Sequence, residues 1–264
     1  MLALAVIAAT VGLLAWGPVP IGRDAHHYAD SRAWFGIPNA LNVLVNLPLF
    51  WLAAWGWCAT RASGWPRPLR APWQCFHLCA MVTALTSAMY HAAPSDGLYV
   101  LSLMGQAGAF ALLTFGLLAE RVNRHFGSTA ACLATVLFIA LAGAAMLRQG
   151  QAPADIDLRP LLGLEAIPGL LIPMAALSLA GSHTKASSWV VVVMLYGLAK
   201  LFEYADEAIF RATGVISGHS LMHLSLAVAV GWMAYRASEA GSAATAVGSG
   251  QGTSQRQTSL NTGF

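Results

Sequence analysis

Apolar stretches dominate the chain, and each is about as long as a helix that crosses a lipid bilayer, which takes about 20 residues. The stretches, separated by short polar or proline-containing connections, are residues 2–16, 39–59, 73–92, 98–119, 128–147, 161–180, 188–210 and 218–235. Charged residues make up only 9% of the chain, and the mean hydropathy is +0.62. A soluble domain would carry about 25% charged residues. We therefore predict an all-α, polytopic membrane bundle.

The two ends of the chain differ from this core. The first stretch could be a signal-peptide core, but no basic residue precedes it and the following Gly-Pro-Val-Pro is a poor cleavage site. From residue 237 the chain is rich in Gly, Ser, Ala, Thr and Gln and has no apolar periodicity, which predicts disorder. We expect an additional transmembrane helix in residues 1–20, a seven-helix domain in 21–236 and a disordered cytoplasmic tail in 237–264.

The basic residues of the connections predict the orientation. Arginines and a lysine follow the second, fourth, sixth and eighth stretches. The positive-inside rule therefore places both termini in the cytoplasm and residues 21–38 outside. The loop 148–159 is mixed because Asp155 and Asp157 offset its arginines. The net charge of +3 is explained by these orienting residues and indicates no nucleic-acid partner.

Three histidines converge in this topology. His219 and His223 are four residues apart, so they share one helix face and could hold one metal ion. The third stretch runs outward and ends at His91, while the last stretch begins outside with the other two. Ordinary packing would explain a histidine pair on one helix, but it does not require this convergence. We therefore predict a metal site at the outer end of the bundle.

Several amides and one hydroxyl accompany this site. Asn39, Asn42 and Asn46 lie on one helix face near the same end. They form either interhelical hydrogen bonds or a cation-coordinating shell. Ser87 lies one turn deeper than His91, where a serine either bonds back to a carbonyl or takes part in a site.

Ionisable residues inside apolar stretches usually mark a site or a pair. Lys200 and Glu203 are at pairing distance on one helix, and we expect an ion pair that fixes helix packing. Glu165 is expected to pair within the bundle. Asp206 lies nearer the outer end and is a candidate partner of a metal-bound histidine. The four cysteines follow no CxxC pattern, which indicates free thiols.

Taken together, five segments resemble the membrane hydrolase superfamily of the alkaline ceramidases and adiponectin-receptor-like proteins. The resemblance is closest to its bacterial ceramidase-like branch. The segments are 28–32 (YADSR), 36–48 (GIPNALNVLVNLP), 87–91 (SAMYH), 200–203 (KLFE) with Asp206, and 217–223 (SGHSLMH). They extend over the seven-helix core, so the resemblance implies that fold and an integral protein of a bacterial inner membrane.

The resemblance also implies the roles of several residues. The family holds zinc with three histidines, which fall on His91, His219 and His223, and its serine falls on Ser87. The family's aspartate, eleven residues beyond the first histidine, falls on Ser102. A hydroxyl cannot accept a proton as a carboxylate does. Either another carboxylate substitutes, with Asp96 and Asp206 as candidates, or the protein is slow or inactive as a hydrolase.

Eukaryotic members of the family also bind calcium near the start of the first core helix. A glutamate that they use there falls on Asn39, so a Ca²⁺ ion is not favoured.

The sequence therefore predicts a zinc-dependent intramembrane hydrolase of a lipid amide, with a ceramide-like substrate as the family implies. The oligomeric state is left open. One alternative is a non-catalytic zinc protein, either a receptor or a lipid-binding relative, for which Ser102 is the main argument. The other is a haem protein with two axial histidines, although His219 and His223 on one helix face cannot lie on opposite sides of an iron.

Overall fold

The computed structural model describes residues 1–149 and 156–260, with side chains for 1–148 and 156–240. Within them the protein is helical, and the only extended pairing is an isolated bridge between Trp34 and Ile37. The helices are α1 (Leu2–Trp16), α2 (Ala40–Leu44), α3 (Asn46–Ala62), α4 (Arg67–Ala92), α5 (Asp96–Arg121), η1 (Arg124–Gly127), α6 (Thr129–Gln149), α7 (Arg159–Ser178), α8 (Ala186–Tyr204), α9 (Asp206–Thr213) and α10 (Gly218–Leu260). Asp155 of the mixed loop and residues 261–264 of the predicted tail lie outside the described residues. The predicted all-α bundle is confirmed.

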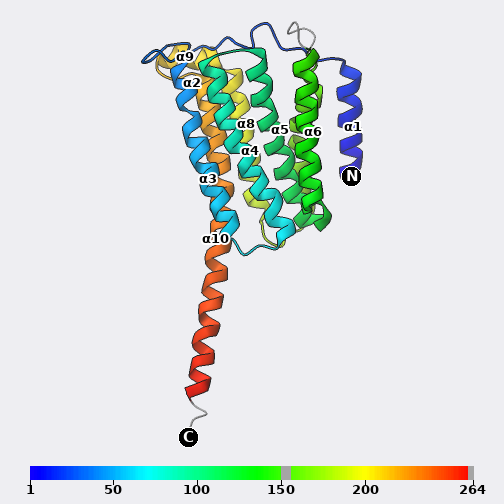
Figure 1. Cartoon of the computed structure of the whole chain (residues 1–264), viewed down its shortest axis with the longest axis vertical. Helices are drawn as coiled ribbons and strands as arrows, with labels where there is room; N and C mark the ends of the chain where they lie inside the picture. The colour runs from blue at the N-terminus through cyan, green and yellow to red at the C-terminus, as the bar shows by residue number, and fades with distance from the viewer. Residues whose placement is uncertain (150–155, 261–264) are drawn as a thin grey trace.

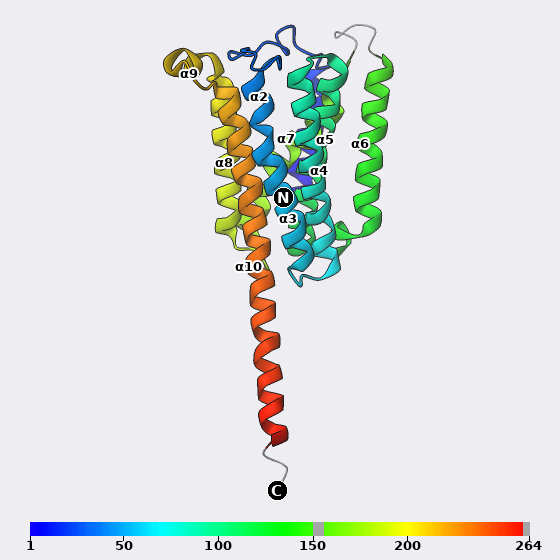
Figure 2. The same cartoon turned by 60° about the vertical axis from the view of Figure 1, so that its left-hand side comes forward.

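The long helices run side by side along one axis (Figures 1 and 2). The pair α2–α3 packs against α4 and α10, α4 packs against α5, and α5 against α7. Helix α8 packs against both α7 and α10, so these helices surround a common core. The short helix α1 lies on the flank and packs against α7.

Several of these helices could cross a membrane by length and composition. Five spans meet that description: Ala40–Ala62, α5, α6, α7 and α8. The bent pair of α9 with the first part of α10 would make a sixth. Helix α4 has 26 residues but carries Arg67 and Arg70 in its first turn, and α1 has only 15 residues. The bundle thus has the architecture of a polytopic membrane protein.

The predicted continuous helix over residues 188–210 is wrong at its end. Helix α8 ends at Tyr204, and the following residues form the separate helix α9. The axes of α9 and α10 are bent by 107°. Figure 1 shows α9 lying across the end of the bundle. Helix α9 carries Asp206, Glu207 and Arg211 within eight residues, and ionised groups are costly to bury in an apolar interior.

Helix α10 continues to Leu260, beyond residue 237 where the sequence predicts a tail (Figure 1). A lack of apolar periodicity argues against a packed face, but it does not prevent a helix, whose hydrogen bonds are local. The chain also has no proline after Pro173 that would break this helix.

Helix α4 ends and α10 begins at the same end of the bundle, which we call the histidine end. Towards the opposite end, aromatic packing holds the core together. Trp73 and Trp189 are fully buried, with their ring centroids 6.2 Å apart, and Trp65 packs on Trp73 at 4.7 Å. This packing fixes the position of α4 against α8.

Candidate metal centre

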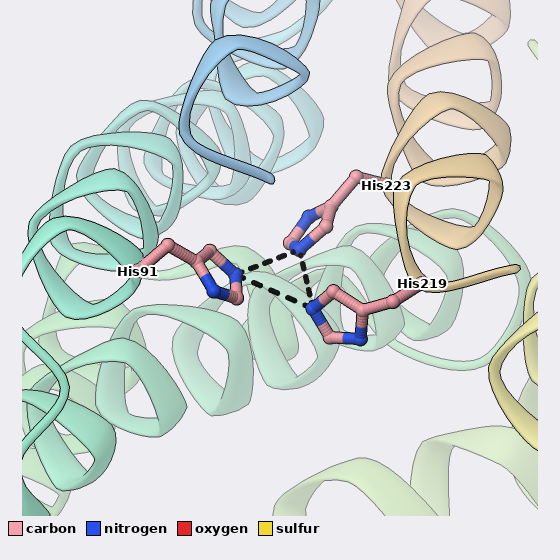
Figure 3. A group of neighbouring side chains, drawn as sticks. All are labelled: His91, His219 and His223. Atoms are coloured by element: carbon pink, nitrogen blue, oxygen red, sulfur yellow. Dashed lines mark hydrogen bonds between the residues drawn. The ribbon is translucent and has the colours of Figure 1, made fainter. Parts of the chain in front are cut away.

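Three imidazoles meet between α4 and α10. His91 comes from the last turn of α4, and His219 and His223 come from the first two turns of α10 (Figure 3). The Nε2 atom of His91 lies 3.2 Å from that of His223 and 3.3 Å from that of His219. The Nε2 atoms of His219 and His223 are 3.2 Å apart. Thus the structure brings the three predicted metal ligands together, and among the described residues they form the only such cluster of potential ligands.

The triangle of nitrogens fits a tetrahedral metal ion. Zinc binds imidazole at about 2.0–2.1 Å, so two ligands at a tetrahedral angle lie about 3.3–3.4 Å apart. Hydrogen bonds among the three imidazoles explain the triangle less well than a metal ion does. In neutral histidines each Nε2 is either a donor or an acceptor. Three such atoms cannot form donor–acceptor pairs along all three edges, so at least one edge joins two like atoms.

The same geometry argues against haem. Two nitrogens only 3.2–3.3 Å apart leave no room between them for a porphyrin plane. All three nitrogens instead approach one point. The geometry of the predicted site therefore suits one metal ion bound by all three histidines.

Tyr28 covers the centre. Its ring centroid lies 4.7 Å from that of His91 and 4.9 Å from that of His219. Its hydroxyl is buried and has no hydrogen-bond partner among the described residues. Burial raises the pKa of the Tyr28 phenol. The sequence analysis assigned no role to this residue, because only the fold brings the loop before α2 over the histidines.

Asp206 anchors the segments around the centre. Its Oδ1 accepts a hydrogen bond from the backbone N–H of His219 at 2.7 Å, and its Oδ2 accepts one from the N–H of Ala29 at 3.0 Å. It thus holds the first turn of α10 and the loop that carries Tyr28. From the sequence, Asp206 was a candidate partner of a metal-bound histidine. It binds the backbone N–H of His219 and not the imidazole, so it positions this ligand through the main chain.

Gly218 allows α10 to begin this close to α8 and α9. A Cβ atom at this position would lie 2.1 Å from the carbonyl oxygen of Phe202 and 2.7 Å from the Cα of Asp206. Backbone atoms cannot yield as a flexible side chain can. The glycine immediately before His219 is therefore a requirement of the close approach.

The asparagines form structural hydrogen bonds. Asn39 donates to the carbonyl oxygen of His91 at 2.9 Å, and Asn42 donates to that of Asp30 at 3.2 Å. The Ser220 hydroxyl donates to Asn42 Oδ1 at 2.7 Å. Ser220 lies between the two histidines of α10, so this bond ties the ligand-bearing helix to α2. For Asn39 and Asn42 the contacts therefore support hydrogen bonding between segments, whereas Asn46 donates to the carbonyl oxygen of Asn42 and its buried Oδ1 has no partner among the described residues.

The acidic residue closest in sequence to the start of the first core helix, Asp30, already has a cationic partner. The carboxylate of Asp30 is fully engaged by Arg32, whose Nε lies 2.7 Å from Oδ1 and whose Nη2 lies 2.7 Å from Oδ2. These hydrogen bonds hold the pKa of the Asp30 carboxyl below its usual value. The same guanidinium donates to the carbonyl oxygens of Gly214 and Val215 at 3.1 and 2.7 Å. A cationic side chain thus already occupies the space around this carboxylate.

The remaining predicted site residues lie outside the triangle. Ser87 is buried on α4, one turn deeper than His91. Ser102 is partly buried on α5, between Tyr99 and Gln106 on one face of the helix. At the start of α5, Asp96 Oδ1 accepts a hydrogen bond from His26 Nε2 at 3.0 Å. Neither Asp96 nor Asp206 therefore offers a carboxylate free of partners.

An apolar cavity lies deeper in the bundle than the histidines. It is lined from α3, α4, α5, α8 and α10, and the space in it that a water-sized molecule can occupy is about 80 Å³. On the ligand-bearing helices it begins at Thr83, two turns before His91, and at Leu226, one turn after His223. Its polar lining includes Gln106 and Tyr196. An amphipathic molecule with its tail in this cavity would bring a polar group towards the three nitrogens.

The expected pairing of Lys200, Glu203 and Glu165 is found. Lys200 Nζ lies 3.0 Å from Glu203 Oε2 and 3.1 Å from Glu165 Oε1. Gln106 and Tyr196 also donate to Glu165, at 2.7 and 2.8 Å. These two donors were not identified from the sequence, although both are polar residues within apolar stretches, which is the signal that could have revealed them.

One further buried histidine also escaped the sequence analysis. His77 is fully buried on α4, and neither ring nitrogen has a partner among the described residues. Its ring packs so closely on Gly56 that a Cβ there would lie 2.2 Å from Cε1. It does not belong to the metal-ligating group.

Comparisons with known proteins add no relative: no protein-family model matches the chain, and neither does any curated protein. The interpretation of the centre therefore rests on the residues and their geometry.

Proposed function

We propose that this chain is an integral membrane, zinc-dependent hydrolase of a lipid amide bond, with a ceramide-like substrate. The observation that carries the proposal is the triangle of three Nε2 atoms at tetrahedral spacing, next to an apolar cavity inside the bundle. The resemblance to ceramidase-like hydrolases gives the reaction class.

His91, His219 and His223 would hold the ion. Held by three neutral histidines, zinc would keep one tetrahedral position for water and would lower the pKa of that water to about 7. Tyr28, which lies over His91 and His219, would shield the ion from one side. Ser87, one turn deeper than His91, is the hydroxyl that we assign to the amide carbonyl as a hydrogen-bond donor.

The cavity supplies the apolar part of the substrate site. Its lining is almost entirely hydrophobic, so it suits an acyl chain better than a polar one. A lipid with its chain in the cavity would present its amide at the level of the histidines. Under the positive-inside rule, the histidine end faces away from the cytoplasm, in a bacterial inner membrane.

Zinc analysis combined with an activity assay tests the proposal. We expect stoichiometric zinc in the purified protein and release of fatty acid from at least one lipid amide in a panel. The activity should disappear on chelation and return when zinc is added. Stoichiometric zinc without hydrolysis of any lipid amide would contradict the proposed hydrolase activity but would still support the metal site.

A non-catalytic zinc protein is the second candidate, and a specific observation favours it. Ser102 replaces the family's aspartate, Asp96 pairs with His26, and Asp206 binds two backbone N–H groups. The three positions considered for the base thus offer a hydroxyl and two carboxylates that already have partners. In this case zinc would fix α4 to α10, and the cavity would bind a lipid without cleaving it.

A further inference from the structure

The ion-pair cluster of Glu165, Lys200 and Glu203 is not used by the proposed reaction. Glu165 is buried and its carboxylate accepts from Gln106, Tyr196 and Lys200. These partners come from α5 and α8, so the cluster joins three helices. Glu165 is therefore satisfied by hydrogen bonds and a shared counterion.

Glu203 is in a different position. Its one ion-pair partner among the described residues is Lys200, and Lys200 is shared with Glu165. With both carboxylates ionised, the described residues of the cluster carry one more negative charge than positive charge. The side chains of Lys200 and Glu203 are 46% and 43% exposed, so a ligand can approach them.

The cluster adjoins both the cavity and the metal centre. Gln106 and Tyr196, which bind Glu165, also line the apolar cavity. On α8, Glu203 lies about two turns beyond Tyr196, in the last turn before Asp206, whose carboxylate binds the N–H of His219. The negative charge therefore lies where the polar end of a lipid would lie when its tail fills the cavity.

We infer that this cluster is a headgroup site for amphiphiles that carry a protonated amine. A cationic headgroup would balance the extra negative charge of the cluster, whereas a phosphate or carboxylate headgroup would be repelled. The inference rests on the proposed function for the idea that a lipid occupies the cavity, and it concerns a protonated amine, which amide hydrolysis releases, and not the uncharged amide. Charge, rather than shape, is the property by which the site would select.

Binding of simple amphiphiles tests this site apart from catalysis. The probes are a long-chain primary amine and the alcohol and alkyl sulfate of the same chain length. They are titrated into the full chain in neutral detergent after chelator treatment, so that no probe can ligate a metal. We expect the amine to bind about fivefold more tightly than the alcohol, as for a partly exposed charge pair, and the sulfate most weakly.

Glu203→Gln removes the negative charge and keeps the shape of the side chain. It should abolish the preference for the amine over the alcohol. Glu207→Gln is the matched control, because Glu207 is an exposed glutamate on α9 that pairs with Arg211. It should keep the preference. Equal binding of amine and alcohol to the wild type, or an unchanged preference in Glu203→Gln, would overturn the headgroup site.

The two proposals fail separately. A preference for the amine in a protein that hydrolyses no lipid amide would support the headgroup site and contradict the enzyme. Amide hydrolysis without a preference for the amine would overturn the headgroup site but would still support the proposed hydrolase activity.

Discussion

The two ends of the bundle use polar side chains in opposite ways. At the end opposite the histidines, Glu120 accepts hydrogen bonds from the N–H groups of His183 and Thr184, at 2.6 and 2.7 Å, and from the Thr184 hydroxyl. Arg121 donates to the carbonyl oxygens of Ala176, Leu179 and Thr184. These bonds fix the end of α5 to the connection between α7 and α8, and they satisfy backbone groups that the helix ends leave free.

At the histidine end, the three imidazoles direct their nitrogens at one another and not at the backbone. Asp206 and Asn39 satisfy the surrounding backbone groups instead. The difference separates a structural polar cluster from a functional one. A structural cluster engages its donors and acceptors with the protein itself, whereas a functional cluster keeps ligand atoms available and has other residues that hold it in place.

The largest effect is expected from removal of a ligand. His91→Ala, His219→Ala and His223→Ala should each abolish stoichiometric zinc, because two imidazoles bind the ion far more weakly than three. Metal analysis of the purified variants measures this. His183→Ala, at the opposite end, is the control and should keep zinc, since Glu120 binds its backbone N–H. Normal zinc content in any of the three variants would remove that histidine from the centre.

The next effect concerns the missing carboxylate. If the chain is a hydrolase, Ser102→Asp should raise its rate of lipid amide hydrolysis, because a positioned general base contributes about 10²–10⁴-fold. Ser102→Asn is the uncharged control and should not raise the rate. A wild type without activity and an unchanged Ser102→Asp variant would favour the non-catalytic zinc protein. A robust wild-type activity that Asp206→Asn or Asp96→Asn abolishes would show that the base lies on one of those residues.

A smaller effect is expected from the backbone contact before His219. Gly218→Ala forces a Cβ against backbone atoms of α8 and α9 and should lower the free energy of unfolding by about 1–3 kcal/mol. Because the same shift moves His219, zinc affinity should fall as well. Gly197→Ala on α8 is the matched control, since a Cβ there meets nothing within 4 Å. Equal free energies of unfolding for the two variants would show that the backbone at Phe202 and Asp206 can move to accept the added Cβ.

The smallest effect is expected at the opposite end. Glu120→Gln keeps one carbonyl acceptor but weakens the charge-assisted bonds, so the free energy of unfolding should fall by about 1 kcal/mol. Zinc content should not change. The midpoint of thermal unfolding and metal analysis on the same sample would measure both. Loss of zinc in this variant would contradict the separation of the two ends.

Sequence reasoning reached the ligands because it needed only the alternating direction of successive helices. That alternation brings His91 to the level of His219 although 128 residues separate them. The ion pair of Lys200 and Glu203 was also predicted, because it is local to one helix. Contacts that depend on how a loop folds back were not accessible in this way. The position of Tyr28 over the imidazoles and the two backbone hydrogen bonds of Asp206 are of this kind.

The break of the helix at Ala205 was missed for a related reason. The window 188–210 is apolar on average because of the residues of α8, yet the charges of α9 and the binding of Asp206 to two backbone groups turn the chain across the bundle. Hydropathy measures the cost of burial averaged over a window. It does not register a single carboxylate that binds the start of the following helix.

The order in which the ligands are synthesised determines when the centre can bind a metal ion. One ligand, His91, is synthesised early, and the other two follow 128 and 132 residues later in α10. A chain truncated anywhere before α10 keeps one of the three ligands and cannot retain the ion. Metal capture would therefore report that synthesis has reached α10 and that this helix has docked against α4, and shorter products would stay open to degradation.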